Sequence, residues 1–542
     1  MRTLFGIFSV VMILVSCQSP DPDAGKAIFY YNEASGITSL DPAFARSQSN
    51  IWAVNQLFNG LVQLSDSLEV APCIAKSWDI SADGKQYVFH LRRDVYFHDD
   101  PLFPQGKGRL VNANDVVYSF NRILDPAIVS PGLWVFGHVA KVNPFLAIDD
   151  STLQINLQEA FPPFLGLLTM QYCSVVPQEV VTHYGKEFRM HPVGTGPFVF
   201  KHWEEGVRLN MVHNAHYFES ENGQQLPYLD AVSIGFIPNR ESAFMDFLQG
   251  RLDFISGIDG AYKDMLLTRD GKLQAKFENK DIVMAVSPFL NTEYLGFRMD
   301  NDPSNPLSIK EIRQAINCGF DRGRMIAYLR NNIGRPANSG FVPEGIASFD
   351  AQVVKGYQYD PAKSRQLLEK AGYPGGKGLP LIKLGTVASY LDYCQFIQSQ
   401  LAEVGIKIKV EVNADAMNRE LIAKGQQAFF RGSWIADYPD AENYLSLFYT
   451  ANRAPQGPNT THFSNATFDH WYEAALQTTD ESRRVRLYQQ MDSLVMEEAP
   501  IVPLYYDQSV RLHRRCISGL GSHPMNLLSL KRVKKQLEKA SK

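Results

Sequence analysis

The chain has 542 residues, of which 45% are hydrophobic and 20% are charged, a composition typical of globular proteins and unlike that of disordered or collagen-like chains. A single hydrophobic core stops growing at about 250–300 residues, so we expect two or three lobes. The net charge of -4 disfavours a nucleic-acid-binding protein, which usually has a strong excess of basic residues.

The first residues are typical of an export signal. Arg2 supplies a positive end, and the apolar run 4–15 that follows is too short for a permanent membrane helix, which needs about 20 residues. Leu14-Val15-Ser16-Cys17 resembles a bacterial lipobox, in which the cysteine carries acyl chains that hold the protein at a membrane. We predict a signal peptide over 1–16, a lipid on Cys17 and a polar tether over 17–25. The alternative is an ordinary signal peptide with an incidental cysteine.

Strand and helix signals then alternate along the chain without an internal repeat. Apolar residues at every second position predict strands, whereas cap residues followed by helical spacing predict helices. The predicted elements are a strand at 87–92, a helix from Asn114-Asp115, a helix opened by a capping box of Ser308 and Glu311, a helix from Asp360-Pro361 to Gly372, a strand at 406–412 and a helix through 485–495. The mixture indicates an α/β or α+β fold. The basic end, 531–542, is typical of a solvated tail or surface helix.

Sequence signatures of enzymes and metal sites are missing. The chain has no Gly-x-Ser-x-Gly, His-Glu-x-x-His, Walker or Gly-x-Gly-x-x-Gly pattern. Its histidines are dispersed and it has no Cys-x-x-Cys, so no metal, redox group or other cofactor is indicated. Whether any disulfide forms is left open. We therefore expect a protein that is not an enzyme.

Several stretches, in order along the chain, resemble the extracellular solute-binding proteins of oligopeptide, dipeptide and nickel ABC importers, and most closely the oligopeptide-binding members. The stretches are Ser39-Leu40-Asp41-Pro42, Leu57 to Val62, Pro72 to Trp78, Asp83 to Arg92, Asn114 to Phe120, Pro192 to Phe198, Ile312 to Asn317 with Asp321-Arg322, Tyr359 to Tyr373, Trp434 to Leu445 and Ala499 to Tyr506.

The resemblance implies a two-lobe fold of the periplasmic-binding-protein type, class II, with an extra subdomain inserted in the first lobe. By order of segments, lobe I would comprise 26–62, 190–288 and 505–530, the inserted subdomain 63–189, and lobe II 289–504, followed by the basic tail. The chain would cross between the lobes near Pro288 and 505, and the ligand would lie between the lobes.

The segment from Arg431 to Asp437 is the most informative one under this resemblance. In peptide-binding relatives, the aspartate of a matching Trp-x-Ala-Asp-Tyr segment pairs with the ligand's α-ammonium, and Asp437 falls on that position. Trp434 would pack on the first ligand residues, while Ser433 and Ile435 would offer main-chain groups. Arg431 would bind the ligand's carboxylate, because its guanidinium can donate to both carboxylate oxygens. The alternatives are a turn-forming Asp437, a core Trp434 and a structural ion pair at Arg431.

The opposite wall of the site is expected near Arg46, Ser47 and Gln48, where the equivalent segment of relatives pairs with the peptide as an added strand. This chain departs from the oligopeptide pattern, because Arg46 replaces an acidic residue. Gly132 also stands where an aromatic residue is common, with Trp134 two positions on. Both departures leave the preferred peptide length and side chains open.

The resemblance therefore implies a monomeric, lipid-anchored receptor that captures short peptides and passes them to the transmembrane subunits of an ABC permease. It would lie on the periplasmic side of a membrane, with surface display left open. The alternatives keep the fold but bind nickel chelate, haem, an oligosaccharide or a cell-wall peptide. A more distant alternative is a secreted hydrolase, for which the sequence offers no nucleophile with an adjacent base.

Overall fold

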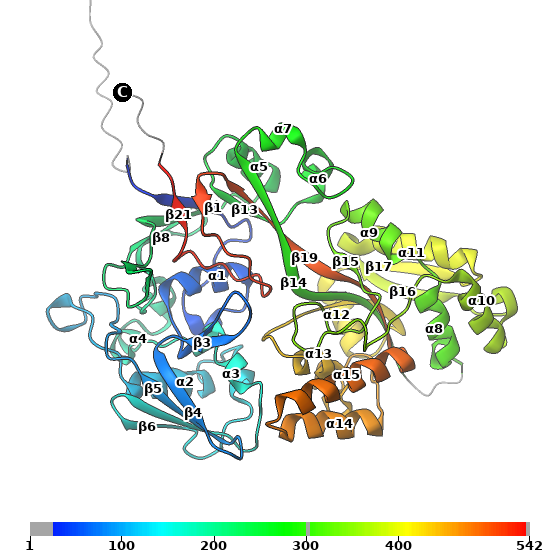
Figure 1. Ribbon diagram of the computed structural model, residues 1–542, viewed down its shortest axis with the longest axis horizontal. Helices are drawn as coiled ribbons and strands as arrows, with labels where there is room; N and C mark the ends of the chain where they lie inside the picture. Colours follow the sequence, from blue (N-terminus) through cyan, green and yellow to red (C-terminus); the bar gives the residue numbers. More distant parts are fainter. Residues whose placement is uncertain (1–24, 300–303, 538–542) are drawn as a thin grey trace, which may run out of the picture.

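Two antiparallel strands join the two lobes of the protein. The computed structural model describes residues 25–299 and 304–537. Strands β14 (Ile282–Phe297) and β19 (Ile501–Arg514) pair along most of their length and cross the middle of the molecule (Figure 1). They are the centre of one large sheet, whose order is β17-β16-β18-β14-β19-β13-β1-β12-β9-β8. The pairing of β14 with β19 is irregular between Pro288 and Thr292.

Lobe I is built on one end of this sheet and on a separate four-stranded sheet of order β4-β5-β7-β6. Its elements on the large sheet are β1 (Ile28–Asn32), α1 (Gln48–Leu57), β8 (Phe198–Glu204), β9 (Arg208–His213), β12 (Ala231–Gly235), α5 (Arg240–Leu248), β13 (Phe254–Ser256), α6 (Gly260–Leu266) and α7 (Ala275–Glu278). The elements around the separate sheet are β2 (Val62–Leu64), β3 (Val70–Pro72), β4 (Ala75–Ile80), β5 (Gln86–Leu91), α2 (Ala113–Leu124), β6 (Phe145–Asp149), β7 (Thr152–Asn156), α3 (Phe164–Leu167) and α4 (Gln178–Tyr184). Strands β1 and β12 run parallel.

Lobe II surrounds the other end of the large sheet. Its elements are α8 (Lys310–Cys318), α9 (Arg322–Arg330), β15 (Arg335–Pro336), α10 (Pro361–Lys370), β16 (Ile382–Val387), α11 (Leu391–Glu403), β17 (Ile408–Asn413), α12 (Asp415–Ala423), β18 (Phe429–Ile435), α13 (Glu442–Leu445), α14 (Ala466–Gln477) and α15 (Glu481–Glu498). Helices α14 and α15 lie on the side that borders lobe I in Figure 1. The predicted α/β fold is confirmed.

Most of the predicted elements form, although two predicted caps are wrong. Helix α2 begins at Ala113 with Asn112 as its N-cap, so Asn114 and Asp115 lie in its first turn and do not cap it. Strand β5 and helices α10 and α15 occur where the periodicity predicts them, and α10 starts at Pro361 with the Asp360 side chain accepting from the Lys363 N–H at 2.9 Å. The capping box at Ser308 does not form. Ser308 lies in a short 3-10 turn and donates its hydroxyl to the Asn305 carbonyl at 2.7 Å, so α8 begins at Lys310 without a side-chain cap.

The basic end of the chain is docked up to Gln536 and is neither a solvated tail nor a helix there. Strand β21 (Lys534–Lys535) pairs with β20 (Ile517–Ser518), and Val533 is fully buried. Lys531 pairs with Glu219 at 2.5 Å, and Lys535 pairs with Asp253 at 2.8 Å. The carboxylates of Glu219 and Asp253 therefore neutralise Lys531 and Lys535, which the charge pattern assigned to solvent.

Candidate functional site

The segment that carries the predicted site leaves the large sheet at its interlobe side. Strand β18 pairs antiparallel with β14, with Trp434 opposite Thr292, and ends at Ile435. The buried Asn443 then holds the turn, because its side-chain oxygen accepts from the Trp434 indole N–H at 2.9 Å and from the Asp437 backbone N–H at 3.2 Å. Asn443 thus holds the side chain of Trp434 and the backbone of Asp437. Sequence reasoning missed it, although it lies within the same motif.

Asp437 has an exposed carboxylate with no ion pair among the described residues. Solvent reaches the side chain, yet enough protein surrounds it that burial raises the pKa of its carboxyl, while a hydrogen bond with Asn443 opposes that shift. An unpaired carboxylate in partly desolvating surroundings favours a cationic ligand, since a cation restores the charge balance that burial removes.

Lobe I meets this turn through aromatic contacts. The ring of Tyr438, next to Asp437, lies 6.5 Å from the ring of Trp134, and its side chain also lies close to Gly166 of α3. Tyr438 is buried within the hydrophobic core of lobe I. Trp134 remains 43% exposed, so part of its surface is open beside Asp437. The structure thereby brings Trp134 to the Asp437 turn.

Tyr172 occupies the space that an aromatic residue at position 132 would fill. A Cβ atom on Gly132 would lie 2.4 Å from the Tyr172 ring, so the glycine makes room for it. The pKa of Tyr172 is raised to about 12, mainly by burial; the charge of Asp437 contributes to this rise and the charge of Arg46 opposes it. Tyr172 therefore stands close to charged groups of both lobes. The sequence alone gave no signal for this residue, because it is remote from Gly132 along the chain.

The segment Arg46-Ser47-Gln48 forms a turn and a helix start instead of a strand. Ser47 is the N-cap of α1 and its hydroxyl accepts from the Asn50 N–H at 3.4 Å, while Gln48 is already helical. All three side chains are exposed. The predicted addition of a ligand strand here stays a prediction.

Arg431 is held by an acidic partner. Its guanidinium pairs with the buried Glu293 and lies 3.2 Å from the centroid of the Tyr390 ring. Burial raises the pKa of Glu293 and the charge of Arg431 opposes this. The structural ion pair foreseen as an alternative is therefore present. The Arg431 Nε atom has no hydrogen-bond partner in the described parts of the chain, and contact with a ligand carboxylate stays a prediction.

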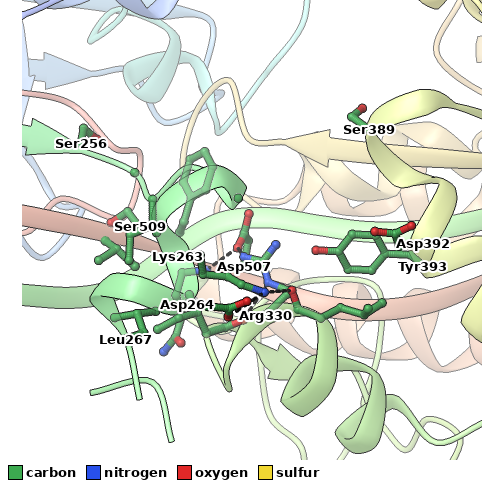
Figure 2. Close-up of a pocket in the computed structure, with 18 of the residues that line it drawn as sticks. Ser256, Lys263, Asp264, Leu267, Arg330, Ser389, Asp392, Tyr393, Asp507 and Ser509 are labelled. Atoms are coloured by element: carbon green, nitrogen blue, oxygen red, sulfur yellow. Dashed lines mark hydrogen bonds and ion pairs between the residues drawn. The ribbon is translucent and has the colours of Figure 1, made fainter. Parts of the chain in front are cut away.

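A cavity of about 610 Å³ lies beside the connecting strands β14 and β19. Hydrogen bonds link it to the ion pair of Glu293 and Arg431. Asn291 donates to Glu293 at 3.0 Å and to Asp507 at 3.3 Å, and Asp507 pairs with Arg330. Figure 2 shows Arg330, Asp507 and Lys263 together, with Tyr393 opposite them on α11. Lys263 of lobe I donates to the Leu329 carbonyl of lobe II at 2.9 Å. The cavity is thus lined by both lobes and connected to Arg431 by polar contacts.

A buried carboxyl lies behind the Asp437 turn. Glu442 accepts hydrogen bonds from the hydroxyls of Tyr438 and Tyr472. Burial raises its pKa to about 7, and the two hydrogen bonds oppose the shift.

The raised pKa of Glu442 predicts pH-dependent stability. The folded state binds this proton more tightly than the unfolded state does, so the stabilisation is present at low pH and is lost as the pH rises from about 4 to about 7, at a cost on the order of 3 kcal/mol. Urea unfolding at several pH values is expected to show this fall, with a smaller fall in Glu442→Gln. An identical pH dependence in that variant would contradict the assignment.

The described residues contain no group of three or more His, Cys, Asp or Glu side chains arranged to hold a metal ion. Within the same ranges, no helix is long and apolar enough to cross a membrane. Cys17 and its predicted lipid lie outside the described residues.

Comparison with known proteins decides the family. The family described as bacterial extracellular solute-binding proteins, family 5 (middle), matches residues 69–456. The chain belongs to this family. Glutathione-binding protein GsiB of Escherichia coli (strain K12) is 28% identical over 519 residues, which cover 94% of this chain and 94% of GsiB. The predicted resemblance is confirmed, and these relatives are binding proteins of transporters.

Two solved structures with a similar fold align with 94% of this chain. The periplasmic binding protein DppA from Helicobacter pylori, in complex with the peptide STSA, has a TM-score of 0.73 and 26% identity and covers 94% of this chain and 97% of its own. HbpA2 from Haemophilus parasuis has a TM-score of 0.82 and 22% identity, with 94% and 100% covered. The likeness to HbpA2 shows the fold alone. The family 5 protein therefore has the two-lobe fold that its motifs predict.

Proposed function

We propose that this family 5 protein captures short peptides between its lobes and delivers them to the transmembrane subunits of an ABC permease. The observation that carries the proposal is the carboxylate of Asp437, which has no ion pair among the described residues and is next to Tyr438, whose ring contacts Trp134 of lobe I. A peptide enclosed there brings one fixed positive charge, whose burial without a partner would cost several kcal/mol. Asp437 neutralises that charge and sets the register of the ligand.

Lobe closure is part of the proposal. A ligand that contacts both lobes binds the closed state better and shifts the population toward it, so that the permease can distinguish loaded from empty protein. The irregular stretch of β14 between Pro288 and Thr292 lies near the crossing expected from the sequence. We assign the lobes to the predicted segments, with 63–189 as the inserted subdomain and 289–504 as lobe II. Lipidation of Cys17, with residues 17–25 as tether, would hold the protein at the membrane.

The relatives' ligands support a small peptide-like cargo. GsiB is named for glutathione, a tripeptide, and the DppA structure holds a peptide. Nickel chelate, haem, an oligosaccharide or a cell-wall peptide is the alternative cargo. A secreted hydrolase is the remaining alternative class, and steady peptide turnover abolished by one substitution would support it.

Native mass spectrometry of the protein purified without denaturation tests the class of cargo. We expect additional mass that fragments into short peptides carrying free amino ends, since affinities in the micromolar range or tighter, about 8 kcal/mol or more, retain ligand during purification. Asp437→Asn protein prepared in parallel is expected to carry less of this mass. A sugar or a metal complex in the wild-type spectrum would contradict the peptide assignment.

A further inference from the structure

The sheet of lobe I has an open face at the edge where the chain enters the fold. In the pairing of β12 with β9, Val232 lies opposite Met211, and both belong to the lobe I core. The next pair, Ala231 and Val212, faces the other way because side chains alternate along a strand. Val212 is accordingly 37% exposed. This outward face borders a cavity of about 490 Å³ that is lined by residues of lobe I alone, so it is separate from the interlobe site.

The cavity on this face carries an excess of positive charge. Lys26, Lys201 and Arg208 line it, whereas Asp230 is the one carboxylate among the described residues that does so. The Asp230 carboxylate already accepts from the backbone N–H of the residue after Lys26, at 2.7 Å. Lys201 and Arg208 are exposed, and neither forms an ion pair with any residue in 25–299 or 304–537. Glu204 lies opposite Arg208 in the pairing of β8 with β9 but outside the cavity lining.

The cavity lies where the predicted tether joins the fold. Lys26, which lines it, directly follows the tether of residues 17–25, and nine residues span at most about 30 Å. A lipid on Cys17 therefore keeps this face close to the membrane surface. The C-terminal strand β21 lies at the same end of lobe I, because Lys535 donates to the carbonyl of Ile28, another lining residue, at 2.8 Å (Figure 1).

A membrane surface with anionic lipids is the partner that fits both the charge and the position of this face. Basic side chains are attracted to such a surface within about a Debye length of it, and lipid phosphates accept hydrogen bonds from ammonium and guanidinium groups. The chain as a whole has a net charge of -4, so its overall charge opposes binding to anionic lipid. Only a local gathering of cations can reverse that repulsion.

We propose that this basic face of lobe I docks on the anionic headgroups of the membrane that holds the anchor, with Lys201 and Arg208 contacting lipid phosphates. The inference goes beyond the capture of peptides and uses the predicted lipid on Cys17 only to bring the face near the membrane. Because the docked face belongs entirely to lobe I, lobe II remains free to close on a ligand about β14 and β19.

Vesicle sedimentation tests the docking without the anchor. The exported chain, from residue 17 onward, carries Cys17→Ser so that no lipid is attached, and it is mixed with vesicles of phosphatidylglycerol and phosphatidylcholine in equal parts or of phosphatidylcholine alone. We expect binding to the anionic vesicles that is at least about tenfold tighter than binding to the neutral ones and that weakens as salt is added. Lys201→Gln combined with Arg208→Gln is expected to weaken anionic-vesicle binding by roughly tenfold or more. Lys377→Gln combined with Lys407→Gln, which removes two exposed charges of lobe II, is expected to leave it unchanged.

Three outcomes would overturn the inference. They are no detectable binding to anionic vesicles, equal binding to anionic and neutral vesicles, and equal weakening by the two double variants. The comparison of vesicles uses the Cys17→Ser protein alone, so it remains decisive whatever the stability of the other variants. Peptide calorimetry on the Lys201→Gln, Arg208→Gln protein is expected to give an unchanged Kd, so that failure of membrane docking and failure of the proposed peptide binding are seen separately.

Discussion

Replacing Arg431 by leucine is expected to destabilise the protein by about 3–5 kcal/mol, because the change leaves a buried carboxylate without its partner. The Glu293 side chain is only 3% exposed and pairs with Arg431. An unpaired carboxyl in this place would take up a proton to avoid its desolvation cost. The loss in unfolding free energy, measured by urea denaturation, is therefore expected to be larger at pH 8 than at pH 5.

A matched double variant separates the ion pair from simple loss of side-chain volume. Arg431→Leu combined with Glu293→Leu removes both charges, and we expect it to be closer to wild type in stability than the single variant is, since apolar replacements of a buried pair are often tolerated. Equal destabilisation by both variants would show that packing against Tyr390, not charge, accounts for the cost.

Replacing Asp437 by asparagine is expected to weaken peptide binding by about 2–5 kcal/mol, or roughly 30-fold to 5,000-fold in Kd, since the ligand ammonium loses its charged partner on closure. Folding stability is expected to change little, because the carboxylate is exposed in the structure described here. Calorimetry with one fixed peptide measures the first effect, and thermal unfolding without ligand measures the second.

Glu369→Gln is the control for charge in this comparison. Glu369 is an exposed residue of α10, at the outer edge of lobe II in Figure 1, so its replacement removes one negative charge of the same lobe away from the proposed site. We expect its peptide affinity to match that of wild type. Similar weakening by both variants would indicate a general electrostatic effect and would contradict a specific contact at Asp437.

Local patterns predicted much of the secondary structure. Strand β5 and helix α15 follow from the spacing of their apolar residues, and α10 follows from Asp360-Pro361, because each signal lies within a few residues of its effect. The predicted cap at Ser308 failed for a related reason. Asn305 and Pro306 favour a preceding 3-10 turn that uses the Ser308 hydroxyl, and a four-residue motif does not show this competition.

Long-range contacts of the site were harder to predict. The motif from Trp434 to Asp437 identified one wall, whereas Tyr172 fills space above Gly132 only after distant segments have packed together. Glu293 likewise meets Arg431 only because β14 and β18 pair in a particular register, with Glu293 opposite Ser433. Such partners depend on strand register and lobe packing, and periodicity carries no information on either.

The pairing of Asp437 with a ligand's amino group is tested most directly by calorimetry with matched free and N-acetylated peptides of two to five residues. Acetylation removes the positive charge and leaves the rest of the peptide intact. The account predicts measurable binding of the free peptides and loss of binding after acetylation, with Asp437→Asn reducing the difference between the two forms. Equal affinity of wild-type protein for free and acetylated peptides would contradict it.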